Sequence, residues 1–153
     1  MTIRLHNGIQ LYYNIGRVHR YVSSAEKVIF DRAPVDYLAY SQYTANQRST
    51  DIDDAFVQSM VPAVREALDR LDILAFVPQS DSWPVGMEDD GIRPVEHPYR
   101  ADVDAIFKQI YREKRFNILP QVNPPLLIEL VGPPEERLLQ LSHAVEQRAD
   151  LSS

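Results

Sequence analysis

Three short apolar runs, separated by stretches with helical periodicity, constrain the fold of this chain most strongly. The runs are Lys27–Phe30, Asp72–Pro78 and Leu126–Val131. In the stretches between and around them, apolar residues recur every three or four positions, which is typical of amphipathic helices. Strands that alternate with helices favour a parallel sheet with right-handed crossovers. We therefore predict a single α/β domain over residues 1–153, with a three-layer architecture in which helices cover both faces of a parallel sheet.

Charged residues and prolines indicate where the predicted helices begin and end. The first helix covers Gly8–Ser24 and the second begins at Pro34, which suits a first helical turn. Acidic residues at 51, 53 and 54 precede a longer helix, which Pro62 should kink or divide. Another helix includes Tyr99–Tyr111. The last helix follows Gly132–Glu136 and ends in a frayed tail over residues 149–153.

The composition excludes several classes of protein. A net charge of −6 argues against duplex DNA or another nucleic acid as the main partner, because phosphate binding needs excess Lys and Arg. The chain contains no cysteine, which fits a reducing compartment, and we predict a cytoplasmic protein that does not enter a membrane. The four histidines lack the spacing of a zinc site, so no metal site is predicted from them.

The segment Val28–Asp36 contains the strongest candidate site residues. Its apolar run ends in Asp31 and Arg32, and a helix start follows at Pro34. Open parallel sheets bind ligands at the carboxyl ends of their strands, so this acid and base are the first residues to suspect. The alternative is structural: Asp31 caps the helix and Arg32 pairs with a surface acid.

Four segments, taken in order, resemble the P-loop kinase-like ATPases, the group that includes nucleoside and nucleotide kinases. The closest likeness is to ATP-binding domains of the NadR type. The segments are Val28–Tyr40 (VIFDRAPVDYLAY), Leu71–Pro78 (LDILAFVP), Asp89–Ile110 (DDGIRPVEHPYRADVDAIFKQI) and Ile128–Leu141 (IELVGPPEERLLQL). The resemblance implies phosphoryl transfer to a small nucleoside-like or other hydroxyl acceptor, or ATP hydrolysis, with ATP and Mg²⁺ as cofactors.

The resemblance also implies roles for residues in the first segment. Asp31 would be the carboxylate near the acceptor hydroxyl or the metal, and Arg32 would contact phosphate, so both are candidate catalytic residues. Asp36 would be a second contact to the substrate. Alternatively, Asp36 is a first-turn carboxylate favoured by the helix dipole.

Two further regions acquire roles from the same resemblance. The stretch 79–98 would be a lid, in which Arg93 is a catalytic cation and Arg100 a substrate contact. Solvated charges are the alternative for both arginines. Gly132 and Pro133 would form the cofactor-binding loop against the nucleotide base, although an ordinary strand-to-helix turn explains them nearly as well.

One family feature is missing from these residues. No phosphate loop of the form GxxxxGK[ST] occurs, and neither does the strand that should precede it. We therefore expect truncation of some kind, with weak or absent ATP binding and an open edge in the sheet. The rival prediction is a non-catalytic α/β interaction module, in which a partner chain or a second copy completes the sheet at that edge.

Overall fold

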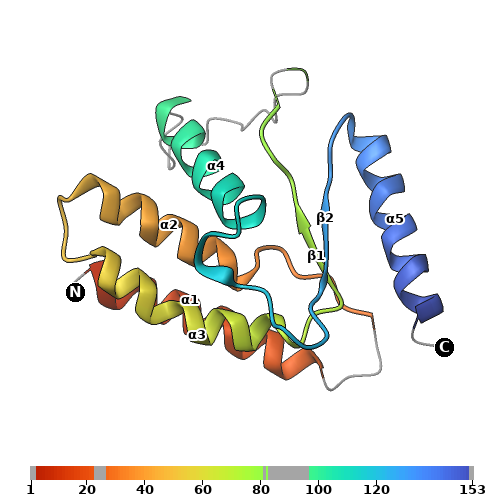
Figure 1. The fold of residues 1–153 in the computed structure, drawn as a ribbon, viewed down its shortest axis with the longest axis horizontal. Coiled ribbons are helices and arrows are strands. Elements are labelled where there is room, and N and C mark those ends of the chain that lie inside the picture. Colours follow the sequence, from red (N-terminus) through yellow and green to blue (C-terminus); the bar gives the residue numbers. More distant parts are fainter. Residues whose placement is uncertain (1–2, 23–26, 81, 83–96, 152–153) are drawn as a thin grey trace.

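The computed structural model describes residues 3–22, 27–80, 82 and 97–151, and helices dominate this part of the chain (Figure 1). In chain order, the elements are α1 (Ile3–Val22), α2 (Pro34–Gln47), α3 (Asp54–Leu68), β1 (Ile73–Phe76), α4 (His97–Tyr111), the short 3-10 helix η1 (Arg115–Asn117), β2 (Leu126–Glu129) and α5 (Pro134–Leu151). None of the described helices is both long enough and apolar enough to cross a membrane.

The predicted three-layer architecture is wrong. In the described residues five α-helices surround a sheet of only two strands, β1 and β2. The two strands are parallel, as expected, and pair from Ile73 with Leu126 to Phe76 with Glu129. The sheet is therefore a small element inside a mainly helical domain, and it is too narrow to form a central layer.

The first predicted strand accounts for most of this error. Lys27–Phe30 has no regular secondary structure and makes none of the backbone hydrogen bonds found between described residues. Its first three side chains are exposed, Ile29 to 84%, and Phe30 is half-buried. A strand is stabilised by pairing with a neighbour as well as by its composition. Without a neighbouring strand, an apolar run of four residues stays irregular.

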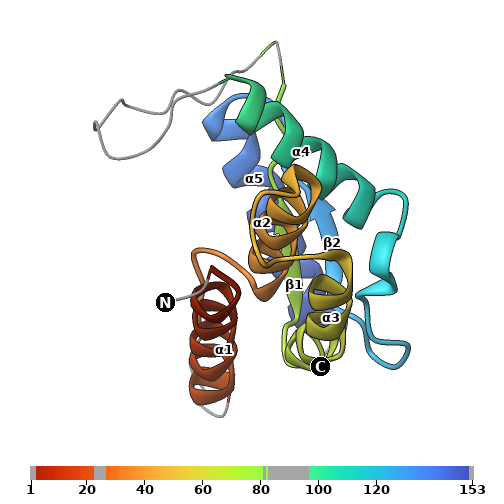
Figure 2. The ribbon, with the colours of Figure 1, turned by 90° about the vertical axis from the view of Figure 1, so that its left-hand side faces the viewer.

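The helices pack in a layer that α5 does not join (Figures 1 and 2). α2 contacts α1, α3 and α4, and α5 contacts β1 and β2. Alternate residues of β1, Leu74 and Phe76, are buried in the core. The main core unites buried side chains from four helices and β1, among them Leu11, Leu38, Val64, Leu68 and Ile110.

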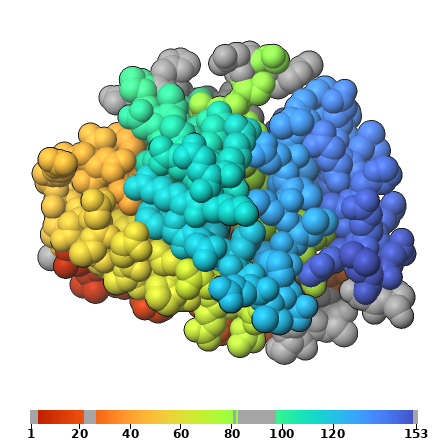
Figure 3. Space-filling view, viewed as in Figure 1, coloured from red at the N-terminus to blue at the C-terminus, as the bar shows by residue number. Residues whose placement is uncertain are grey.

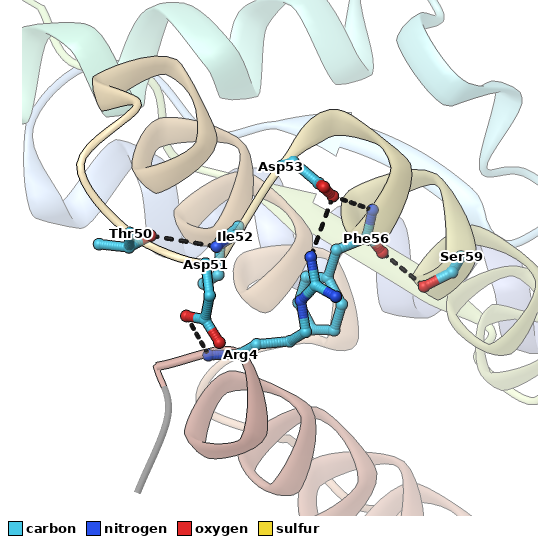
Figure 4. A network of polar contacts seen from close by, with 7 residues as sticks. All are labelled: Arg4, Thr50, Asp51, Ile52, Asp53, Phe56 and Ser59. Carbon is cyan, nitrogen blue, oxygen red and sulfur yellow. Dashed lines mark hydrogen bonds and ion pairs between the residues drawn. The ribbon is translucent and has the colours of Figure 1, made fainter.

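α1 is joined to the start of α3 by a small polar network (Figure 4). Asp53 is the N-cap of α3, and its Oδ1 accepts a hydrogen bond from the Phe56 N–H at 2.8 Å. The same oxygen lies 3.3 Å from an Arg4 guanidinium nitrogen, and the Arg4 backbone N–H donates to Asp51 at 3.2 Å. The predicted acidic start of this helix is thus confirmed.

Pro62 does not divide α3, which runs without interruption from Asp54 to Leu68. The proline is exposed on the outer side of the helix, while Met60, Val61 and Val64 are buried. One turn of α3 therefore lacks a backbone donor on its solvent side, where water can reach the unpaired carbonyl.

A side-chain amide ends the sheet after β2. The Val131 N–H donates to Gln140 Oε1 at 3.0 Å, and Gln140 Nε2 donates to the Val131 carbonyl at 2.9 Å. Gly132 follows with φ +91°, and a Cβ there would lie 2.6 Å from a carboxylate oxygen of Glu136. Only glycine fits this turn into α5 without strain.

Candidate functional site

Arg32 is held by two neighbouring helices, whereas Asp31 is exposed. The Arg32 guanidinium donates to the Tyr40 hydroxyl at 2.8 Å and lies 5.7 Å from the centroid of the Tyr40 ring. Asn14 of α1 approaches the Arg32 carbonyl at 3.5 Å through its amide nitrogen. Burial lowers the pKa of Arg32, but Tyr40 and Asp36 outweigh this effect and raise it above its ordinary value.

The backbone of Arg32 is strained. Its φ is +69°, in the left-handed region that residues with a side chain rarely adopt. Such a conformation costs of the order of 1 kcal/mol or more and persists where surrounding contacts fix it. The contacts with Tyr40 and Asn14 have this effect. Five other described residues with side chains, among them Arg48 and Lys114, also have a positive φ, so the strain by itself does not distinguish Arg32.

Asp36 is the carboxylate that the structure buries. It lies in the first turn of α2, and its backbone N–H donates to the carbonyl of Ala33, the N-cap residue, at 3.0 Å. Burial raises the pKa of Asp36 to about 6, although Arg32 lowers it; Asp31 raises it slightly. Asp31, Arg32 and Asp36 are therefore close enough to act on one another.

Aromatic side chains from α2, β1 and α4 line this cluster. Their ring centroids lie 4.8 Å apart for Tyr43 and Tyr99, 6.2 Å for Tyr40 and Phe107, and 4.9 Å for Phe76 and Tyr111. Burial and the nearby Asp36 raise the pKa of Tyr111, which keeps its phenol neutral. Asp36 therefore lies between the Arg32 guanidinium and the aromatic rings, of which Tyr111 is near enough to be affected by its charge.

The other predicted site residues are not all part of this cluster. Arg100 is partly buried in the first turn of α4, next to Tyr99. Arg93 and most of the predicted lid lie outside the described residues. Gly132 and Pro133 form the tight turn between β2 and α5, and in the described chain no hydrogen bond or ion pair joins them to Asp31 or Asp36.

Three residues at the site were not identified from the sequence. Asn14 is 2% exposed, and its position on the buried stripe between Leu11 and Val18 was an available signal. Tyr40 lies one helical turn after Asp36, so the spacing was also visible. Tyr111 gave no signal, because only the packing of α4 on β1 brings it near Asp36.

The described residues contain no group of three His, Asp or Glu side chains that could hold a metal ion. Asp31 and Asp36 alone do not form such a site, so no magnesium ion is assigned to the cluster.

Comparison with family models, curated proteins and solved structures gives no significant match to this chain. The function must therefore be argued from the cluster itself.

Proposed function

We propose that the cluster of Asp31, Arg32 and Asp36 is the acceptor side of a kinase-like site, which binds a small nucleoside-like molecule through a hydroxyl group. The observation that carries the proposal is the burial of the Asp36 carboxylate, with its pKa raised to about 6, beside Arg32. A desolvated carboxylate is costly to retain, and perturbed carboxylates of this kind are concentrated at binding and catalytic sites.

Each residue has a chemical task in this proposal. A carboxylate with a pKa near neutrality can accept a hydroxyl proton while remaining mostly ionised at pH 7. Arg32, fixed on Tyr40, would neutralise negative charge that develops on a transferring phosphoryl group. The rings of Tyr40, Tyr43 and Tyr99 offer flat apolar surface for a base. Asp31, being exposed, would act at the entrance rather than on the hydroxyl.

Nuclear magnetic resonance titration tests the acceptor site. Purine, pyrimidine and pyridinium nucleosides are added to the labelled chain, with ribose as the sugar-only control. We expect at least one nucleoside to shift the amide signals of Arg32, Asp36 and Tyr40. The variant Asp36→Asn should lose binding at least tenfold, whereas Asp69→Asn, which changes an exposed carboxylate, should not. Absence of shifts at 10 mM of every nucleoside (about −2.7 kcal/mol of binding) would contradict the proposal.

ATP binding is a separate matter, because these residues contain no GxxxxGK[ST] segment. We propose that this chain binds ATP with Mg²⁺ weakly or not at all. Calorimetric titration with the magnesium complex of ATP measures this directly. A dissociation constant in the micromolar range would show that other residues replace the phosphate loop.

A second candidate function rests on a different observation. β1 pairs with one strand in the described chain, and the apolar side chains of Val28 and Ile29 are exposed. These features fit an interaction module to which a partner adds an extended segment. Hydrogen exchange of the chain with and without an isolated partner tests it. Slower exchange at Lys27–Phe30 and Ile73–Phe76 is expected, and unchanged rates there would refute strand addition.

A further inference from the structure

Two helices carry exposed apolar side chains on their outer faces, although each already packs on the domain. On α1 the outer face comprises Leu5, Ile9, Tyr12 and Tyr13, and Tyr13 is 71% exposed. On α5 it comprises Leu138 and Leu139, and Leu139 is 68% exposed. Apolar groups gathered on one helix face, rather than scattered singly, indicate an interaction surface.

The α1 face is hollowed as well as apolar. A shallow groove of about 610 Å³ runs along it and includes Leu5, Gly8, Ile9 and Tyr12. A Cβ added to Gly8 would meet no atom within 4 Å, so the floor of the groove is open to an incoming side chain. A leucine from another helix fits such a hollow, because helices pack by placing ridges of one into grooves of the other.

The two faces carry opposite charge. α1 contains three arginines and no acid, in a chain whose net charge is −6. Arg4 is paired with Asp53 of its own chain, so the positive charge of the α1 face comes from Arg17 and Arg20. On α5 the four acids, Glu135, Glu136, Glu146 and Asp150, are exposed, whereas its two arginines are partly buried. Opposite charge on apolar faces favours association between the two helices and disfavours α1 with α1 or α5 with α5.

The spacing of apolar and charged residues also matches. Arg17 follows Ile9 by eight residues, as Glu146 follows Leu138. Arg20 follows Ile9 by eleven residues, as Asp150 follows Leu139. These separations correspond to about 12 Å and about 16 Å along a helix. The two matches differ in register by one residue, or about 1.5 Å along the helix axis. A parallel arrangement therefore places the apolar halves against each other with Arg17 level with Glu146 and Arg20 within one residue of Asp150.

We propose that the outer face of α1 binds the outer face of α5 on a second copy of this chain. The two helices lie on different sides of the molecule: α5 forms one flank in Figure 3, whereas α1 shows only at the lower edge. In the described chain α1 packs on α2 and α3, and α5 on the sheet. The contact is thus head-to-tail, and it leads to a ring or an open chain of copies. One helix pair buries little area, so association is weak and depends on concentration.

Sedimentation with two complementary variants tests this arrangement. The variant Tyr12→Asp/Tyr13→Asp places two negative charges on the apolar face of α1. The variant Leu138→Asp/Leu139→Asp does the same on the apolar face of α5. We expect the unchanged chain to associate as its concentration rises, and each variant alone to associate at least tenfold more weakly. An equimolar mixture should form a species of two chains, because each variant supplies the intact face that the other lacks.

The controls make the outcome decisive. Val122→Asp changes an exposed apolar residue outside both faces and should associate like the unchanged chain. Circular dichroism of each variant establishes that its helices are retained. Higher salt should weaken association, because the flanking charges are exposed. A monomer at all concentrations, association of the Leu138→Asp/Leu139→Asp variant with itself, or a mixture that stays monomeric would overturn the proposal.

Discussion

At the scale of single residues, Asp36 and Asp31 show how differently two nearby carboxylates behave. Asp31 is exposed, whereas Asp36 is partly buried between Arg32 and the aromatic layer, with a pKa of about 6. A pKa above the ordinary value means that folding favours the protonated form. The ionised carboxylate therefore lowers the free energy of unfolding at neutral pH.

The variant Asp36→Asn should stabilise the domain in a pH-dependent way. The unfolded state releases the proton near pH 4 and the folded state near pH 6. The cost of the ionised carboxylate is thus absent below about pH 4, grows between pH 4 and 6, and is constant above. We expect about 3 kcal/mol of added stability at pH 8 and less than about 1 kcal/mol at pH 4. Urea unfolding at both pH values measures this.

The exposed carboxylate of Asp69 provides the matched control. Asp69→Asn should change the free energy of unfolding by less than about 0.5 kcal/mol at either pH. If Asp36→Asn destabilised the domain at pH 8, the attraction between the carboxylate and Arg32 would outweigh burial, and the carboxylate would be structural rather than functional. Stabilisation together with lost nucleoside binding is the combination that the proposed function requires.

The candidate cluster could be predicted from the sequence in part. Asp31, Arg32 and Asp36 lie together, as expected from one short segment that turns into a helix. Which carboxylate is buried could not be predicted, because this depends on α4 packing against α2. Tyr99 and Tyr111 reach the site from a helix that lies 63 to 75 residues after Asp36, and no local spacing reveals such a contact.

At the scale of elements, α3 illustrates an internal proline that a helix tolerates. Pro62 supplies no N–H, so the Gln58 carbonyl has no partner one turn later within the helix. Tertiary packing of Met60, Val61 and Val64 on the core holds the helix together across this gap. The local cost of the proline is thus smaller than the stabilisation that the buried face provides.

We expect Pro62→Ala to stabilise the domain by about 1 to 3 kcal/mol, because it restores a backbone hydrogen bond at an exposed position and loses little packing. The more flexible unfolded chain offsets part of this gain. Chemical denaturation measures the difference. Gln58→Ala, on the exposed side of the same helix, should lie within about 0.5 kcal/mol of the unchanged chain. A destabilised Pro62→Ala variant would mean that the ring itself packs on a neighbour.

The helices were easier to predict than the strands for a physical reason. A helix satisfies its own hydrogen bonds, so periodicity and end residues such as Pro34 and Asp53 identify it locally. A strand needs a partner elsewhere in the chain. Leu126–Glu129 finds one in β1, whereas Lys27–Phe30, with a similar composition, does not. Most of the error in fold class follows from this unpaired segment.

At the scale of the whole molecule, α5 is attached less firmly than the other helices. Ala144 is its one buried residue among those described, and the main core includes no residue of α5. Segments with few buried apolar contacts open locally at a lower free energy than the core. α5 should therefore open before the layer of α1 to α4 does.

Native-state hydrogen exchange measures this order directly. We expect amides in the middle of α5, around Ala144, to exchange at least tenfold faster than amides around Val64 in α3. Amides within α3 and α2 serve as the internal reference, because both helices belong to the main core. Equal protection in α5 and α3 would show that the domain opens as one cooperative unit.

The pairing of Gln140 with Val131 sets where the sheet can grow. A carboxamide has the same donor and acceptor as a peptide unit, so this side chain stands in for one residue of an absent neighbouring backbone. Beyond Leu130, an added strand could pair with Val131 only by displacing the Gln140 side chain from its two hydrogen bonds. The Gln140 side chain thus hinders the addition of a strand at the carboxyl end of β2. In the described chain no such pairing protects the side of β1 that faces away from β2.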